Sequence, residues 1–325
     1  MDISVLICTY NRAASLRQTL QSCCALVIPE GLTWELLLVD NNSADTTKQV
    51  CDEFADKLPL RYIFETRQGK SFALNTAVQS ATGELVVFTD DDVTVTPQWI
   101  AELWTAADSN HKVSFFGGPI SVLWESPPPK WIEDHWFWRV ITVNYSLGEK
   151  DLLLSGENSS TFFGANQAFR RYVFQQGFDF STKLNLGVNG NTSSAFGRVG
   201  GEDGDIQQRL FAAGHQALYV AKASVHHRTA IERTTERFFR TYCRATGIEW
   251  VRNGLGPDGQ RRFLHVPPFI WKKCARHTVR FFLRRWTRPA KVWLAEEYEM
   301  ARYQGMILEY LRRHKSSKSN AVDQE

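Results

Sequence analysis

The sequence predicts an α/β protein with a mainly parallel central sheet, followed by a helical, basic C-terminal extension. Over about the first 120 residues, short apolar runs alternate with amphipathic stretches, which is the pattern of βαβ units. Beyond Gly259 the chain becomes basic and aromatic. A chain of 325 residues with 43% hydrophobic and 22% charged residues has an ordinary globular composition. It is long enough for one large domain with appendages or for two smaller domains.

The first βαβ unit is expected to end at Asp40. Ile3–Cys8 is almost entirely apolar and should form a strand. Ser15–Ala25 should form a helix, because its apolar residues recur at helical spacing. Trp34–Val39 is a second apolar run, so Asp40 should stand at the carboxyl end of a strand.

The pattern then repeats along the chain. Asn42 or Ser43 is expected to cap a helix that reaches Phe54, since both side chains can accept a bond from a free backbone N–H. Arg61–Phe64 should form the third strand, and Ser71–Gln79 the helix after it.

The fourth strand, Leu85–Phe88, is expected after a turn at Thr82-Gly83 and runs almost directly into three adjacent aspartates. Pro97–Ala107 should be a helix with proline in its first turn, and Val113–Phe116 another strand. The three aspartates should therefore lie at the carboxyl end of a strand, where open α/β sheets bind their ligands.

The alternation of apolar runs and amphipathic stretches ends at about residue 121. The segment from there to about 160 contains three consecutive prolines and should cross the sheet as an irregular segment. Pattern returns at "TFFGANQAFRR" (161–171), followed by a Gly-rich loop over 185–206. A helix is expected from about Glu202 to Ala213, and a single strand over Gln216–Val225.

The segment between Gly259 and Ala295 holds many cations and no acidic residue. Its basic residues are Arg261, Arg262, Lys272, Lys273, Arg276, Arg280, Arg284, Arg285, Arg288 and Lys291. Aromatic residues are interleaved with them, which predicts basic amphipathic helices suited to an anionic surface. The net charge of the whole chain is only +3, too small by itself to indicate nucleic-acid binding.

Two acidic clusters are candidates for chemistry. Asp90, Asp91 and Asp92 repel one another unless a cation intervenes, and hard divalent cations prefer oxygen ligands; a solvated acidic turn is the alternative. Glu202-Asp203 could supply a general base, or could instead stabilise the start of a helix.

Several polar residues could complete such a site. The doublet of His226 and His227 follows a predicted strand, and alternation sends one ring to each face, so at most one should bind metal. Arg67 and Lys70 flank Gly69 on a loop where positive charge could meet phosphate or base.

Six segments taken in order resemble the GT-A glycosyltransferases of family 2. They are "SVLICTYNR", "LLLVDNNSADTT", "RQGKSFALNTAVQSATGELVVFTDDDV", "FFGANQAFRR", "GFDF" and "GGEDGDIQQRLFAAG". The resemblance covers residues 3 to about 228. It implies a GT-A, Rossmann-like domain over 1–230, with a nucleotide-binding half at about 1–120 and an acceptor half at about 121–230, and leaves 231–325 as the helical, basic extension.

The resemblance also implies an activity, namely inverting, metal-dependent transfer of a hexose-type sugar. The donor would be a nucleoside diphosphate sugar, expected to be a UDP-sugar, and the acceptor a hydroxyl of a glycan or a lipid-linked carrier in polysaccharide or glycoconjugate biosynthesis. The cofactor would be a divalent cation, Mn²⁺ or Mg²⁺.

Site roles follow by the same resemblance. Asp203 would be the catalytic base, with Glu202 orienting the acceptor. Asp92 and His227 would hold the metal, with His226 as the alternative ligand. The residues expected to bind the donor nucleotide are Thr9, Asn11, Arg12, Asp40, Asn42, Arg67, Lys70, Asp90 and Asp91. Asp40 would read the base, although capping of the next helix is an equal alternative for it.

Two other classes of function are weighed against this one. A nucleic-acid-binding protein could use residues 261–291, but carboxylates at strand ends would repel phosphate, and no nucleic acid is expected as a partner. A dinucleotide-dependent oxidoreductase is disfavoured because the first loop, "CTYNRAAS", lacks the GxGxxG pattern.

The expected location is the cytoplasm, with 261–291 touching the inner face of the cell membrane. No signal peptide is expected, because "MDISVLICTY" runs directly into a strand. No apolar run approaches the roughly 18 residues of a membrane span. The six cysteines, with no CxxC pair, are expected to be reduced thiols.

Overall fold

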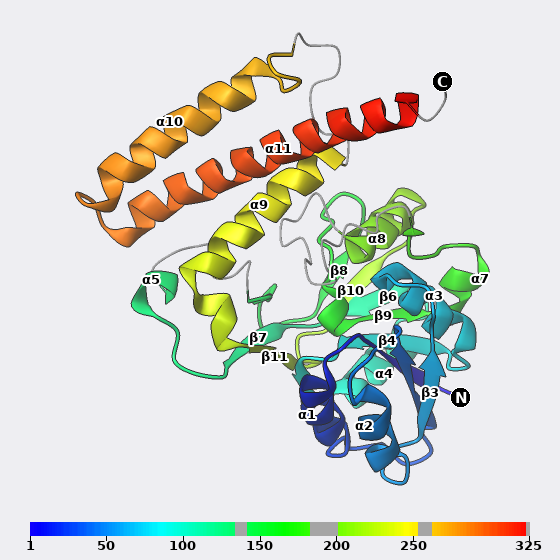
Figure 1. The fold of residues 1–325 in the computed structure, drawn as a ribbon. Helices are drawn as coiled ribbons and strands as arrows, with labels where there is room; N and C mark the ends of the chain where they lie inside the picture. Colours follow the sequence, from blue (N-terminus) through cyan, green and yellow to red (C-terminus); the bar gives the residue numbers. More distant parts are fainter. Residues whose placement is uncertain (134–141, 183–200, 253–261, 323–325) are drawn as a thin grey trace. The chain divides into compact units, whose positions relative to one another are not determined.

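The computed structural model describes residues 1–133, 142–182, 201–252 and 262–322 (Figure 1). The chain divides into two compact units. The first consists of Met1–Glu125 and Thr142–Thr229, and the second of Ser126–Ile141 and Ala230–Glu325.

An eight-stranded sheet forms the centre of the first unit, in the order β3-β2-β1-β4-β9-β6-β10-β8. Its strands are β1 (Ile3–Thr9), β2 (Trp34–Asp40), β3 (Leu60–Phe64), β4 (Leu85–Asp90), β6 (Phe115–Gly117), β8 (Leu152–Leu154), β9 (Gln167–Arg170) and β10 (Ala217–Tyr219). Strands β3, β2, β1 and β4 are parallel, as are β6 and β10, whereas β9 and β8 run antiparallel to their neighbours. The prediction of an α/β fold with a mainly parallel sheet is confirmed.

Helices cover both faces of this sheet because strand residues alternate between two apolar cores. Val5 and Ile7 of β1 face one core, and Leu6 faces the other. The first core lies under α1 (Ala13–Cys23), α2 (Thr47–Phe54) and α4 (Trp99–Ser109), and the second under α3 (Lys70–Ser80), α7 (Arg171–Gln175) and α8 (Glu202–Ala212). Each large apolar side chain that is fully buried contributes about 1.5–3 kcal/mol.

A small second sheet in the same unit has the order β5-β11-β7. Its strands are β5 (Val93–Val95), β7 (Ile120–Trp124) and β11 (Val225–Thr229). Strand β11 is antiparallel to β5 and parallel to β7, and its register sets His227 opposite Val93. Because β5 begins directly after the aspartate triplet, this sheet carries β11 to the carboxyl end of β4.

Three sequence predictions about elements were wrong. The strand expected over 216–225 is two strands, β10 and β11, because a turn around Val220–Ala223 moves the chain from one sheet to the other. The segment expected to be irregular contains β7, β8 and the short helix α5 (Lys130–Glu133). The N-cap of α2 is Thr46, not Asn42 or Ser43, and the residue before it, Asp45, accepts the backbone N–H of Thr47 at 3.0 Å. Residues 185–200 of the Gly-rich loop expected over 185–206, and Arg261, lie outside the described residues.

The second unit is helical. It contains α5, the 3₁₀ helix η3 (Ile231–Thr234), α9 (Glu236–Arg252), α10 (Pro268–Arg285) and α11 (Ala290–Val322), and both α9 and α10 pack along α11 (Figure 1). Glycines allow the close crossing of α9 and α11: a Cβ at Gly247 would lie 1.9 Å from the Arg302 carbonyl oxygen, and one at Gly305 would lie 2.0 Å from that of Arg244. In the part of the chain that the structure describes, no helix combines the length and apolarity needed to cross a bilayer.

Candidate active site

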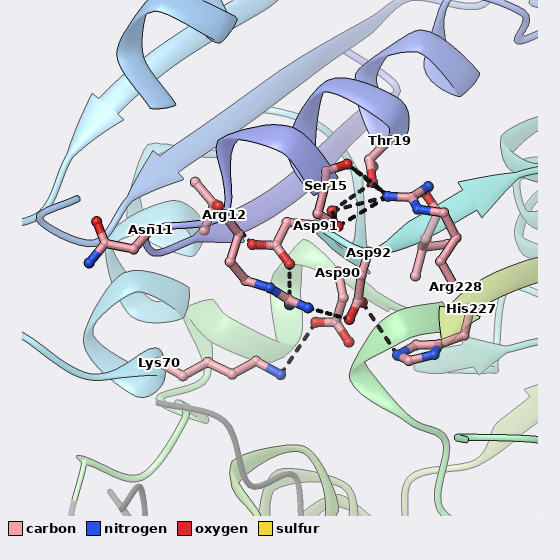
Figure 2. Close-up of polar contacts among 12 residues, drawn as sticks. Asn11, Arg12, Ser15, Thr19, Lys70, Asp90, Asp91, Asp92, His227 and Arg228 are labelled. Carbon is pink, nitrogen blue, oxygen red and sulfur yellow. Dashed lines mark hydrogen bonds and ion pairs between the residues drawn. The ribbon is translucent and has the colours of Figure 1, made fainter. Parts of the chain in front are cut away.

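The carboxyl ends of three parallel strands meet at one edge of the large sheet. The register pairs Thr9 with Asp40, and Cys8 with Asp90. Motifs far apart in the sequence therefore converge where open α/β sheets bind their ligands. Figure 2 shows the aspartate triplet there, between Arg12, Lys70 and His227.

Asp91 is buried and holds the loop between β1 and α1. Its carboxylate accepts the Thr9 hydroxyl at 2.7 Å and Arg12 Nη1 at 2.6 Å. Its backbone oxygen accepts the hydroxyls of Ser15 and Thr19, each at 2.9 Å. Burial raises the pKa of Asp91 to about 7, against the opposing effect of the Arg12 charge. This carboxylate is thus turned into the protein and fixes the position of Arg12.

Asp92 lies beside His227. Its Oδ1 is 3.3 Å from His227 Nε2, and its Oδ2 accepts Arg12 Nη2 at 2.9 Å. The backbone N–H of Arg228 donates to the Asp92 carbonyl oxygen at 2.8 Å, which fixes the approach of β11. His226 points to the other face of β11, where its Nδ1 pairs with the Ser121 hydroxyl at 2.5 Å. Of the two histidines, the structure brings His227 to the aspartates.

Arg228, which the sequence analysis did not single out, joins three elements beneath the site. Its guanidinium donates to the carbonyl oxygens of Val93 and Ser15, at 2.9 and 2.7 Å, and to the Thr19 hydroxyl at 2.8 Å. These bonds tie β11 to β5 and to α1, and Figure 2 shows Arg228 beside Ser15 and Thr19 of α1. A basic residue directly after the two histidines in an otherwise strand-like run was the available sequence signal.

Lys70 begins α3 and reaches into a cluster of three carboxylates. Its Nζ lies 3.4 Å from Asp90 Oδ1, 3.4 Å from Glu202 Oε1 and 3.8 Å from Asp203 Oδ2. Burial works to lower the pKa of the Lys70 ammonium, but the three carboxylates outweigh burial and hold this pKa well above its ordinary value. Lys70 therefore links the two acidic clusters that the sequence places more than 100 residues apart.

Asp203 lies in the first turn of α8 but does not cap its own helix. The N-cap, Gly201, has no side-chain cap, and the Asp203 Oδ1 instead accepts Gln167 Nε2 of β9 at 2.7 Å. Its other oxygen packs on the 3₁₀ helix η1 (Gly164–Asn166), where a Cβ at Gly164 would lie only 2.5 Å away. Burial raises the pKa of Asp203 to about 6, although the Lys70 ammonium acts in the opposite direction.

A chain of buried amides fixes the orientation of Gln167. The Phe162 backbone N–H donates to Gln207 Oε1 at 2.7 Å, which leaves the Gln207 amide nitrogen to donate to Gln167 Oε1 at 2.7 Å. The Gln167 amide nitrogen must then face Asp203. The sequence analysis missed both glutamines, although a polar pair inside the apolar "FFGANQAFRR" was a signal for one of them.

Asp40 is buried at the end of β2, with both oxygens engaged. Tyr62 donates to one at 2.8 Å, and the backbone N–H of Ser43 to the other at 2.9 Å. The neighbouring Asn41, also missed from sequence, accepts the Gly69 backbone N–H at 2.8 Å and donates to the Arg67 carbonyl oxygen at 2.6 Å. A carboxylate has about four lone-pair positions, so Asp40 can accept a further bond.

Arg67 is turned towards Glu65. Its guanidinium donates to both oxygens of Glu65, at 2.9 and 2.7 Å. This pairing is the main reason that the pKa of Glu65 falls to about 2. Asn11 binds the neighbouring loop through the Ala44 N–H at 2.7 Å, and Asn42 is exposed. The side-chain bonds seen for Asn11, Arg67 and His226 thus go to Ala44, Glu65 and Ser121.

The donor atoms present suit a cation site that a substrate completes. Among the described residues, no group of three or more His, Cys, Asp and Glu side chains is arranged to hold an ion. Asp92, in the turn directly before β5, offers a carboxylate, and His227, on β11, offers an imidazole. Small divalent cations are commonly held by one or two carboxylates together with substrate phosphates, and this pair fits that arrangement.

The family of the chain follows from comparison with known sequences. The sequence model described as Glycosyl transferase family 2 matches residues 4–178, more than half of the chain. The chain therefore belongs to glycosyl transferase family 2 and is a glycosyltransferase. This membership sets aside the oxidoreductase alternative.

Individual relatives agree with that assignment. A glucosyl-dolichyl phosphate glucuronosyltransferase of Haloferax volcanii is 26% identical over 72% of this chain and 71% of its own length. The succinoglycan biosynthesis protein ExoM of Rhizobium meliloti is 24% identical over 74% and 73%, respectively. The structure of the mannosyltransferase PcManGT from Pyrobaculum calidifontis, in complex with GDP-Man and Mn²⁺, superposes with a TM-score of 0.56 at 19% identity, covering 94% of this chain and 86% of that one. The last comparison supports the GT-A fold.

Proposed function

We propose that this glycosyltransferase moves a hexose-type sugar from a nucleoside diphosphate sugar, expected to be a UDP-sugar, to a hydroxyl group with inversion at the anomeric carbon. The observation that carries the proposal is the placement of Lys70 between Asp90, at the carboxyl end of β4, and Asp203. One cation thus joins a donor-side carboxylate to a carboxylate that can serve as a base. Membership of the family and the nucleotide-sugar complex of a structural neighbour support this reading.

Donor binding is assigned to the strand ends. Asp40 would accept a ring N–H of the base, and Asp90 would contact the ribose or a metal-bound water. Thr9, Asn11 and Arg12 shape the first loop around the nucleotide. Asn42, Arg67 and Asp91 would act less directly, since Arg67 is bound to Glu65 and Asp91 holds Arg12 in place.

Asp92 and His227 would hold the divalent cation, Mn²⁺ or Mg²⁺. Such an ion, when bound, would neutralise the negative charge that grows on the departing diphosphate. Arg12, which reaches both Asp91 and Asp92, keeps the Asp92 carboxylate oriented towards this position. The presence of Mn²⁺ in the complex of the structural neighbour supports this assignment.

Asp203 would act as the general base. As the acceptor oxygen forms its bond to the anomeric carbon, the bond from that carbon to the diphosphate breaks and the hydroxyl proton passes to Asp203. Gln167 takes one lone-pair position of Oδ1, so the carboxylate keeps further positions for the proton. Lys70 stabilises the ionised form before the reaction, and Glu202 would orient the acceptor.

The acceptor is proposed to be a glycan or a lipid-linked carrier at the cytoplasmic face of the cell membrane. The names of two relatives, one a dolichyl phosphate enzyme and one a succinoglycan biosynthesis protein, support this class of acceptor. The division into a catalytic domain at 1–230 and an extension at 231–325 belongs to the same proposal.

The test is a screen of nucleotide sugars for transfer and hydrolysis with Mn²⁺ or Mg²⁺, repeated with a chelator. Asp203→Asn should retain donor binding and lose roughly a hundredfold or more in kcat, because the base is removed. Asp205→Asn is the matched control, since Asp205 lies on the same helix and pairs with Arg209. Wild-type turnover in Asp203→Asn, or activity indifferent to the chelator, would contradict the roles of Asp203 and Asp92.

A further inference from the structure

Helix α10 has one face committed to the helical unit. Ile270 and Phe281 are buried there. Towards α11, His277 Nδ1 lies 2.7 Å from Glu296, and Arg284 Nη1 lies 2.5 Å from the other oxygen of the same carboxylate. These contacts fix how α10 is rotated about its axis, and so they define its opposite face.

The opposite face carries an exposed apolar row. Val279, Phe282 and Leu283 of α10 and Trp286, its C-cap residue with helical backbone angles, follow at i, i+3, i+4 and i+7, which places them on one side of the helix. Trp286 is the extreme case, with 85% of its surface exposed, and the other three are each more than half exposed. An exposed row of large apolar side chains of this kind indicates a surface that binds another molecule or a membrane.

A basic row runs beside the apolar row. Lys272, Arg276 and Arg280 recur every four residues, and all three are exposed. No ion pair to a carboxylate is seen for these three in the described part of the chain, whereas Arg284 and Arg285 are paired with Glu296 and Glu236. Of the ten basic residues between Gly259 and Ala295, these three therefore form a row on α10 whose positive charge no neighbouring carboxylate neutralises within the described residues.

We infer that this face of α10, the docking face, lies flat on an anionic lipid bilayer. The docking face consists of Lys272, Arg276, Val279, Arg280, Phe282, Leu283 and Trp286. The apolar row would enter the boundary between headgroups and acyl chains while the basic row meets lipid phosphates, as in interfacial amphipathic helices. This inference deepens the proposed function, on which the membrane-borne acceptor rests, but docking itself requires neither donor nor catalysis.

Charge favours a lipid surface over other occupants. A second copy that paired its α10 antiparallel on the docking face would bring its basic row beside an equal basic row. A nucleic acid would satisfy the cations but leave the apolar row, including Trp286, in water. An anionic bilayer satisfies both rows, and each cation near its surface strengthens binding roughly fivefold.

Sedimentation with lipid vesicles tests the inference on the full chain. Wild-type protein should bind vesicles of phosphatidylcholine with phosphatidylglycerol far better than phosphatidylcholine alone, and high salt should weaken the binding. Both Arg276→Gln/Arg280→Gln and Phe282→Ser/Trp286→Ser should lower the vesicle partition coefficient roughly tenfold or more. The matched control, Lys112→Gln/Lys150→Gln, removes two exposed cations from the first unit and should leave the coefficient unchanged.

Other results would overturn the inference. Equal binding to neutral vesicles, or unaltered binding of both docking-face variants, would do so. A dimer that Trp286→Ser dissociates would point to a second copy, and tighter binding to a duplex oligonucleotide than to vesicles would point to nucleic acid. Donor hydrolysis in solution should be unchanged in the docking-face variants, so a failure of docking is distinguishable from a failure of the proposed activity.

Discussion

At the scale of single residues, the surroundings of Asp203 determine the pH at which its carboxylate takes up a proton. Burial raises the pKa of Asp203 to about 6, while Lys70 and the hydrogen bond from Gln167 both act to lower it. A base with a pKa near 6 is ionised at neutral pH and still accepts a proton readily. The same burial that makes the carboxylate a stronger base therefore requires a cation close by to keep it charged.

This balance predicts a pH dependence. A base works only when ionised, so kcat should fall about tenfold per pH unit below about pH 6 and level off above it. Lys70→Gln removes a positive charge that lowers the pKa of Asp203. The pH below which kcat falls, the acidic limb of the pH–rate profile, should therefore move to a higher value. The measurement is kcat against pH, with Lys70→Arg as the variant expected to restore the limb. An acidic limb that stays in place in Lys70→Gln would show that Lys70 does not act on Asp203.

Gly164 gives a second prediction at this scale. A Cβ at this position would lie 2.5 Å from Asp203 Oδ2, so Gly164→Ala should displace the carboxylate and lower kcat on the order of tenfold to hundredfold, with donor affinity retained. Gly204→Ala is the matched control, because a Cβ there meets nothing within 4 Å. Steady-state kinetics and nucleotide titration measure both effects, and equal kcat values for the two variants would contradict the proposed packing.

At the scale of elements, long periodic segments could be predicted from sequence, whereas short ones could not. The first four strands and their helices were recognisable because each is an apolar run or a helical repeat several residues long. Strands β5 and β10 have only three residues, and their pairing depends on partners far along the chain. Sequence alone could not place them, and so it could not show why His227 is the histidine that meets Asp92.

Some residues of the candidate site could likewise be predicted from sequence, and others could not. The acidic motifs were visible because carboxylates at strand ends have few structural reasons to cluster. Gln167, Gln207 and Arg228 escaped attention because their roles come from partners on other elements, which only the folded chain brings together. Lys70 was identified as a loop cation, but its three carboxylate neighbours come from two other parts of the chain.

The crossing of α9 and α11 yields a prediction about stability. Gly305→Ala would place a Cβ 2.0 Å from a backbone oxygen of α9, so the helices must move apart at a cost of about 1–3 kcal/mol. Thermal unfolding followed by circular dichroism should show a lower transition temperature for the helical unit, with nucleotide binding by the first unit retained. The same exchange at Gly204 is again the control, and an unshifted transition would contradict the close crossing.

At the scale of the whole molecule, the two units carry different tasks in the proposed function. The first holds the strand-end carboxylates and their cations, and the second carries the docking face on α10. Sugar transfer would thus belong to the first unit and membrane binding to the second. Variants in one unit should leave the task of the other unit intact. This separation is the reason that vesicle binding and donor hydrolysis are independent readouts.

The most direct measurement is the anomalous scattering of manganese in a crystal grown with UDP and Mn²⁺. We expect one strong peak within coordinating distance of both Asp92 and His227, with the diphosphate bound to the same ion and the base near Asp40. Nucleotide bound at another place on the protein, or a manganese peak remote from Asp92, would contradict the account.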